Sequence, residues 1–220
     1  MSSFVDLRRQ FDVNWTTILV GWRGVGVLSP WPDRWKDFPP FVSVEELADY
    51  AHSRLNANSG QDELNAASTL LVCDLLDRIS EPEKSDQALE PRKWWQEEGW
   101  WREEKRGVIC DLLDRLSAID KADPTLELRK WRLVFLEHRL EELPKDPLYG
   151  QIELSEFWSD FGFPPDSPHE AQGVGNSLSP SEFYTQENLD RLLSRHQAWI
   201  RDERESITKA SLSFSTHPAS

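Results

Sequence analysis

Two pairs of aspartates have a spacing that acid–base or metal chemistry could use. Asp74 and Asp77 lie three residues apart, and so do Asp111 and Asp114. On a helix this spacing places both carboxylates of a pair on one side. However, an arginine follows each pair, and catalysis also needs a concave site with convergent groups. We therefore interpret these aspartates as solvated helix faces and expect no catalytic residue.

The remaining sequence carries no other catalytic, metal-binding or cofactor-binding motif. The five histidines lack HExxH or HxH spacing, and no serine or cysteine stands in a GxSxG motif. Cys73 and Cys110 have no CxxC spacing and no histidine nearby, so we interpret them as small packing residues in a reducing compartment. The glycine-rich stretch RGVGVLSP has no following GK[ST]. The sequence thus predicts a protein that is not an enzyme and holds no metal or cofactor.

The elements that carry the aspartates are duplicated. Residues 72–94 and 109–131 align with an offset of 37, and 14 of the 23 positions are identical. Unrelated segments of ordinary composition would share about one or two. Within each copy, apolar residues recur every three or four positions, and a polar, proline-containing turn follows. We therefore predict an all-α fold built on a short array of helical hairpins, two tandem 37-residue units with flanking helices.

The repeat has a consequence at Gly99. The first unit's opening helix should begin near Asp62, which the offset of 37 places on Gly99 in the second unit. We expect a helix break there. The alternative is one long helix from about Glu90 to Ala118, since glycine costs a helix interior only about 1 kcal/mol relative to alanine.

The layout follows from these patterns. We expect Asn14 to cap a first short helix, and the helix over 126–143 to be central, because it is apolar on two faces and includes His138 in its packing. The chain is predicted to form one all-helical domain over 1–220. Its parts are N-terminal helices and a loop (1–58), the duplicated core (59–143), a loop-rich connection with one short aromatic helix around Phe157 (144–183), a final helix (184–208) and a frayed tail (209–220).

Tryptophans alternate with glutamates near the start of the second 37-residue repeat. Either the rings pack inside the array, or some of them are exposed beside acids as an anchor for a cationic partner. Only Trp94 recurs in the repeat, as Trp131, so we interpret these two as structural. The predicted partner-binding residues are the others of this Trp/Glu cluster: Trp95, Glu97, Glu98, Trp100, Trp101, Glu103 and Glu104.

Composition narrows the class of partner. The chain has 39 acidic and 25 basic residues, a formal net charge of −14. This charge repels the phosphates of nucleic acid, so we expect no nucleic-acid partner, whereas a basic protein would be attracted. No stretch approaches the roughly 20 apolar residues of a membrane span, and MSSFVDLRRQF lacks the apolar run of a signal peptide. We expect a cytoplasmic protein with no membrane partner.

Three segments, NWTTILVGWRGVG, ADYA and DPLYGQIELSEFWSDFGFPPD, resemble an uncharacterised all-helical bacterial family. Its members are often found as immunity proteins beside polymorphic or contact-dependent toxins. The resemblance implies a small cytoplasmic protein that binds one cognate toxin domain and blocks it. From the net charge and the Trp/Glu cluster we expect that toxin to be basic and its active site to be occluded. The alternative is an intracellular helical-repeat adaptor with no toxin partner. A third hypothesis, an enzyme using the paired aspartates, lacks a supporting motif.

Overall fold

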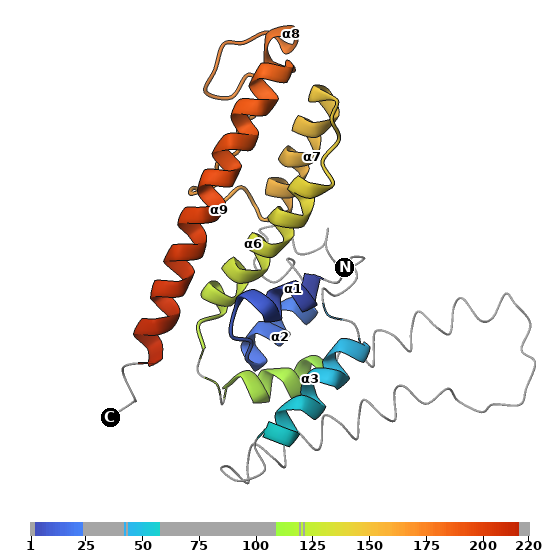
Figure 1. Ribbon diagram of the computed structural model, residues 1–220, viewed down its shortest axis with the longest axis vertical. Helices are drawn as coiled ribbons and strands as arrows, with labels where there is room; N and C mark the ends of the chain where they lie inside the picture. Colours follow the sequence, from blue (N-terminus) through green and yellow to red (C-terminus); the bar gives the residue numbers. More distant parts are fainter. Residues whose placement is uncertain are drawn as a thin grey trace, which may run out of the picture. The chain divides into compact units, whose positions relative to one another are not determined.

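The computed structural model describes residues 3–23, 42, 44–57, 109–118, 120 and 122–215, and these residues form helices without any strand. The all-α prediction is confirmed. Residues 109–118 are helical, and the labelled helices (Figure 1) are α1 (Ser3–Gln10), α2 (Trp15–Arg23), α3 (Val44–Ala57), α6 (Pro124–Glu141), α7 (Pro147–Asp160), α8 (Pro180–Phe183) and α9 (Gln186–Ser215).

The chain divides into two compact units, each assembled from segments far apart in the sequence. The first unit comprises Met1–Asp12, Gly24–Phe38 and Pro124–Ser220, and the second comprises Val13–Arg23 and Pro39–Asp123. The division at Asp123 falls in the turn of the second repeat copy. In this copy the helical residues 109–118 precede α6, while the array of two tandem hairpins stays a prediction. The first copy at 72–94 and Gly99 lie outside the described residues.

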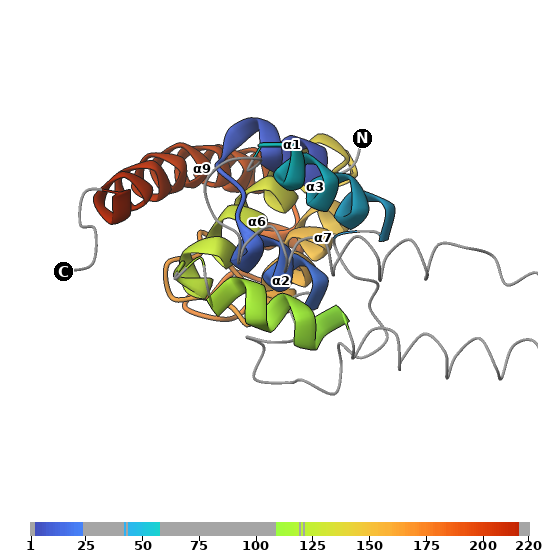
Figure 2. The same ribbon diagram turned by 90° about the horizontal axis from the view of Figure 1, so that it is seen from below.

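Helix α6 is the centre of the first unit, as its apolar pattern predicted. It packs against α1, α7 and α9; Figure 1 shows it beside α7 and α9, and Figure 2 shows the same helices from below. Trp131 is fully buried, and its ring lies 6.2 Å from that of Phe4 on α1. Leu136 joins a cluster with Leu154 of α7 and Ile200 of α9. Burial of these side chains is what orders the helices around α6.

Helix α7 is longer than the short aromatic helix expected in the loop-rich connection. Its N-cap is Asp146, whose Oδ1 accepts hydrogen bonds from the backbone N–H of Leu148 at 3.0 Å and of Tyr149 at 3.1 Å. Pro147 occupies the first turn, where its missing N–H costs nothing. Prolines contributed to the prediction of a loop-rich connection, but Pro147 lies in the first turn of α7.

Helix α9 continues to Ser215, beyond the predicted end at 208, so part of the predicted frayed tail is helical. Ile207 explains the extension. It is fully buried in a cluster with Leu126 and Leu133 of α6, and Ala210 packs against the same cluster. These contacts hold the added turns against α6.

The second unit joins α2, α3 and the helix over 109–118. Asn14 caps α2 as predicted, because its Oδ1 accepts the Thr17 N–H at 2.9 Å. The Trp15 and Tyr50 rings meet edge to face at 5.0 Å, and the Tyr50 hydroxyl donates to the Val13 carbonyl at 2.8 Å. The Asp120 carboxylate accepts the Trp15 N–H. These contacts tie α2 to both of its neighbours.

Candidate functional site

The residues predicted to bind a partner lie outside the described part of the chain, so the Trp/Glu cluster stays a prediction. Asp74 and Asp77 also lie outside it. Of the second pair, Asp111 is exposed, and Asp114 forms an ion pair with Arg23 of α2. The Asp114 carboxylate therefore joins two helices of the second unit, which is a structural role.

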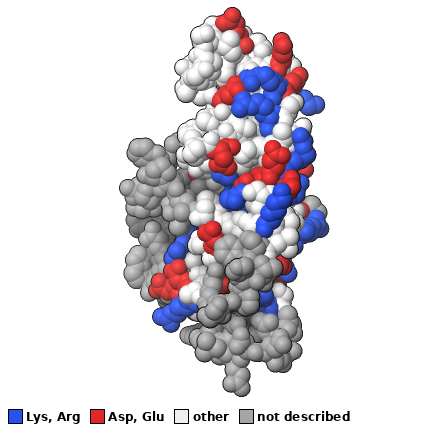
Figure 3. All heavy atoms as spheres, turned by 90° about the vertical axis from the view of Figure 1, so that its left-hand side faces the viewer, with Lys and Arg blue, Asp and Glu red and all other residues white. Residues whose placement is uncertain are grey.

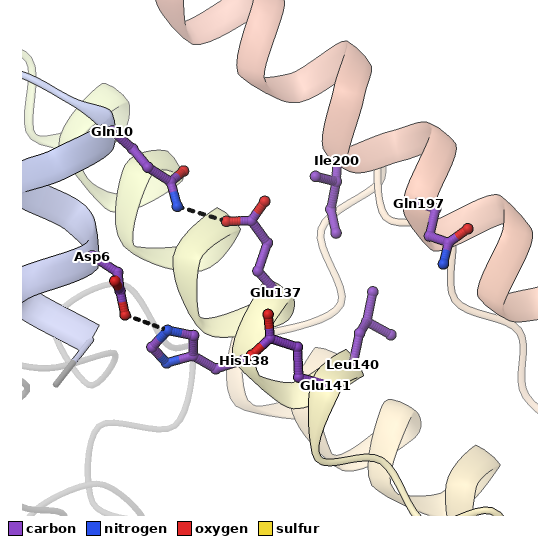
Figure 4. A pocket seen from close by; sticks show the side chains of 8 residues that line it. All are labelled: Asp6, Gln10, Glu137, His138, Leu140, Glu141, Gln197 and Ile200. Carbon is purple, nitrogen blue, oxygen red and sulfur yellow. Dashed lines mark hydrogen bonds and ion pairs between the residues drawn. The ribbon is translucent and has the colours of Figure 1, made fainter. Parts of the chain in front are cut away.

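A pocket of about 460 Å³ opens between α1, α6 and α9 of the first unit (Figure 4). Its polar groups are carboxylates, amides and one imidazole, contributed by the three helices, and two aliphatic side chains complete the wall. The lining residues are Asp6, Gln10, Glu137, His138, Leu140, Glu141, Gln197 and Ile200. Such a lining offers hydrogen-bond acceptors to a cationic group.

His138 stands at one edge of this pocket, in a polar chain rather than in the predicted apolar packing. Its Nε2 lies 2.8 Å from Asp6 Oδ2, and its Nδ1 lies 3.1 Å from Ser3 Oγ. These are the residue types of a hydrolytic triad. Ser3, however, does not line the pocket, and it shares one turn of α1 with Asp6. The three side chains therefore fasten α1 to α6.

Most of the pocket's charge is already compensated. Glu137 accepts a hydrogen bond from Gln10 at 2.8 Å and forms an ion pair with Arg204 of α9. Glu141 and Gln197, in contrast, have no partner within the described residues. The same part of the chain holds no group of three or more His, Cys, Asp or Glu side chains placed to bind a metal ion.

A buried charge network crosses from α6 to α9. Glu203 accepts two hydrogen bonds from Arg129, at 2.8 and 2.7 Å, and one from Arg132 at 3.1 Å. Arg132 also reaches Asp166 at 2.9 Å, and its guanidinium carbon lies 5.0 Å from the centre of the Trp199 ring. The four charges balance, which lets Glu203 and Arg132 remain buried.

Several identical positions of the repeat serve internal packing in the second copy. Glu127 and Lys130, which match Glu90 and Lys93, form a buried ion pair at 2.8 Å. The Lys130 ammonium also donates to the Asp12 carbonyl at 3.1 Å. Such a recurring Glu–Lys spacing is a sequence signal for a structural ion pair, and it does not resemble any catalytic or metal-binding motif.

Some charged side chains among the described residues form ion pairs, whereas others have no oppositely charged partner. On the face in Figure 3, Lys and Arg lie beside Asp and Glu. Among the ion pairs, Arg191 and Arg195 of α9 both pair with Glu170. Within the described residues other carboxylates have no partner. These unpaired acids include Glu141 and Glu142 at the end of α6, Glu156 on α7, and Glu187 and Asp202 on α9. Fewer cations are unpaired there, among them Arg115, Lys145 and Arg201.

Residues 96–204, just under half of the chain, match the model of a family described as an uncharacterized protein conserved in bacteria (DUF2247). This description names no activity, substrate or partner. The matched range includes α6, α7, α8 and most of α9. No curated protein and no solved structure matches the chain. None of the helices among the described residues combines the length and the apolarity that crossing a membrane requires.

Proposed function

We propose that this chain is an immunity protein that binds a basic bacterial toxin domain and blocks its active site. The observation that carries the proposal is the uneven pairing of charges. Cations such as Arg129, Arg132 and Arg204 are engaged in internal ion pairs, while Glu141, Glu142 and Glu156 have no partner within the described residues. These three glutamates are exposed, so their negative charges are available to a partner.

Free carboxylates on a folded surface favour a cationic protein in two ways. They raise the rate of encounter by long-range attraction, and they pair with lysine or arginine side chains at contact. A toxin that acts on nucleic acid must itself present cations to phosphates. An acidic inhibitor can occupy that cationic surface and exclude the substrate. The Trp/Glu cluster at 95–104 stays a predicted contact region for such a partner.

The test is to co-express the chain with the toxin domain encoded by the adjacent gene and to measure growth. The dissociation constant of the two purified proteins is then measured by calorimetry at low and high salt. We expect restored growth and a tight one-to-one complex that weakens as salt rises. An adjacent gene that encodes no toxin, together with several partners of modest affinity, would favour the adaptor function. A chain that neither binds nor protects would refute the proposal.

A further inference from the structure

Helix α7 has one buried side and one exposed side. Leu154 and Trp158 are buried against α6 and α9, whereas Leu148, Tyr149 and Ile152 are 40%, 61% and 37% exposed. Because the exposed residues are one and three or four positions apart, they lie together on adjacent turns. The Tyr149 hydroxyl makes no hydrogen bond to any described residue.

We propose that this side of α7 is the surface on which the basic partner docks, with Tyr149 at its centre. We define the α7 face as Leu148, Tyr149, Ile152 and Glu156. The inference rests on the proposed function and adds to it the place of contact. Single exposed apolar side chains are ordinary on protein surfaces. Three neighbours on one helix form a patch, and tyrosine is among the residues that most often carry binding energy at interfaces.

The charges around the patch indicate what kind of partner it fits. Helix α7 contains Glu153, Glu156 and Asp160 but no lysine, arginine or histidine. Glu153 is paired with Arg139, whereas Glu156 has no partner within the described residues. Glu156 lies one turn beyond Ile152 and two turns beyond Tyr149, on the same side of the helix. The α7 face thus has an apolar centre and an acidic end.

This combination favours a basic protein over the other possible occupants. A second copy of the chain would bring another net charge of −14 against the same acids, and like charges placed together at an interface cost affinity. A cationic domain that presents an apolar residue beside lysine or arginine matches both parts of the face.

Matched substitutions test the inference with the purified toxin domain of the adjacent gene as the probe. Tyr149→Ala is compared with Leu212→Ala, because Tyr149 and Leu212 are 61% and 64% exposed. Glu156→Lys is compared with Asp202→Lys, because both acids are exposed and unpaired among described residues and both changes alter the net charge equally. All four sites are exposed, so thermal unfolding should show that each variant remains folded.

We expect Tyr149→Ala and Glu156→Lys each to raise the dissociation constant by about tenfold or more, and the two α9 controls by less than about threefold. Glu156→Lys should act mainly on the association rate at low salt.

If wild type binds tightly and all four variants bind equally, the partner docks elsewhere and only the α7 inference fails. If wild type does not bind, the proposed function fails and the inference fails with it. A wild-type dimer in light scattering that Tyr149→Ala converts to a monomer would make a second copy the occupant and overturn the inference.

Discussion

The indole Nε1 of Trp158 lies 2.8 Å from Nε2 of His196, in the buried centre of the first unit. Because indole can only donate, Nε2 must be the acceptor, and the ring proton is placed on Nδ1, which donates to the Leu192 carbonyl at 2.7 Å. The geometry therefore requires a neutral imidazole. Burial lowers the pKa of His196 from 6.5 to about 4, an effect that the nearby charge of Arg195 reinforces.

This histidine makes stability fall on acidification. Between pH 6.5 and pH 4 the unfolded chain binds a proton at His196 that the folded chain does not, so the free energy of unfolding decreases as pH falls through this range. The full loss is about 3 kcal/mol. In His196→Gln, a side-chain oxygen can still accept from Trp158 without titrating. Urea unfolding at several pH values should show the stability advantage of wild type over this variant shrinking from pH 7 to pH 4, and parallel curves would contradict the assignment.

The α6–α9 charge network predicts unequal effects for two glutamates on α9. Glu203→Ala leaves the buried Arg132 guanidinium with Asp166 alone, and losing one partner of a buried pair costs about 3–5 kcal/mol. Glu205→Ala removes an exposed pair with Lys209 and should change stability little. Denaturant unfolding of both variants makes the comparison. Equal effects would mean that the buried network does not stabilise the unit.

Gly150 is required by a close approach between α7 and its surroundings. A Cβ atom there would lie 2.8 Å from the Pro144 carbonyl oxygen and 3.2 Å from Leu189 Cδ2. Alanine normally stabilises a helix relative to glycine by about 1 kcal/mol. Here we expect Gly150→Ala to destabilise by about 1–3 kcal/mol, as overpacking does. A lowered melting temperature in calorimetry confirms this; a raised one would show that the backbone shifts without cost.

Removing the N-cap of α7 should have a smaller effect on the free energy of unfolding. Asp146→Ala removes the acceptor of two backbone N–H groups and should cost about 1 kcal/mol. Asp202→Ala, an exposed aspartate in the interior of α9, is the matched control and should be near neutral. Because the α7 face begins at Leu148, loss of the cap should also increase hydrogen exchange of the Leu148 and Tyr149 amides. Unchanged exchange at these two amides would contradict the capping role.

The sequence was sufficient for features that depend on near neighbours. Apolar residues three and four apart predicted the all-α fold and the central place of α6, and Asn14 before Trp15 predicted the start of α2. The length of α7 was missed because Pro147 and Gly150 usually mark loops. Here the proline occupies a first turn and the glycine allows a tight contact with Pro144. These two roles depend on surroundings that spacing alone does not reveal.

Tertiary structure alone decided which polar residues meet and which apolar residues stay exposed. Arg129 and Glu203 lie 74 positions apart in the sequence. His138 lies 135 positions from Ser3 and 132 positions from Asp6. Helical periodicity places Tyr149 and Trp158 on opposite sides of α7, but only the packing of α6 and α9 determines that Trp158 is buried and Tyr149 exposed. Local hydrogen bonds and periodicity act within a few residues, whereas burial depends on elements brought together by the whole fold.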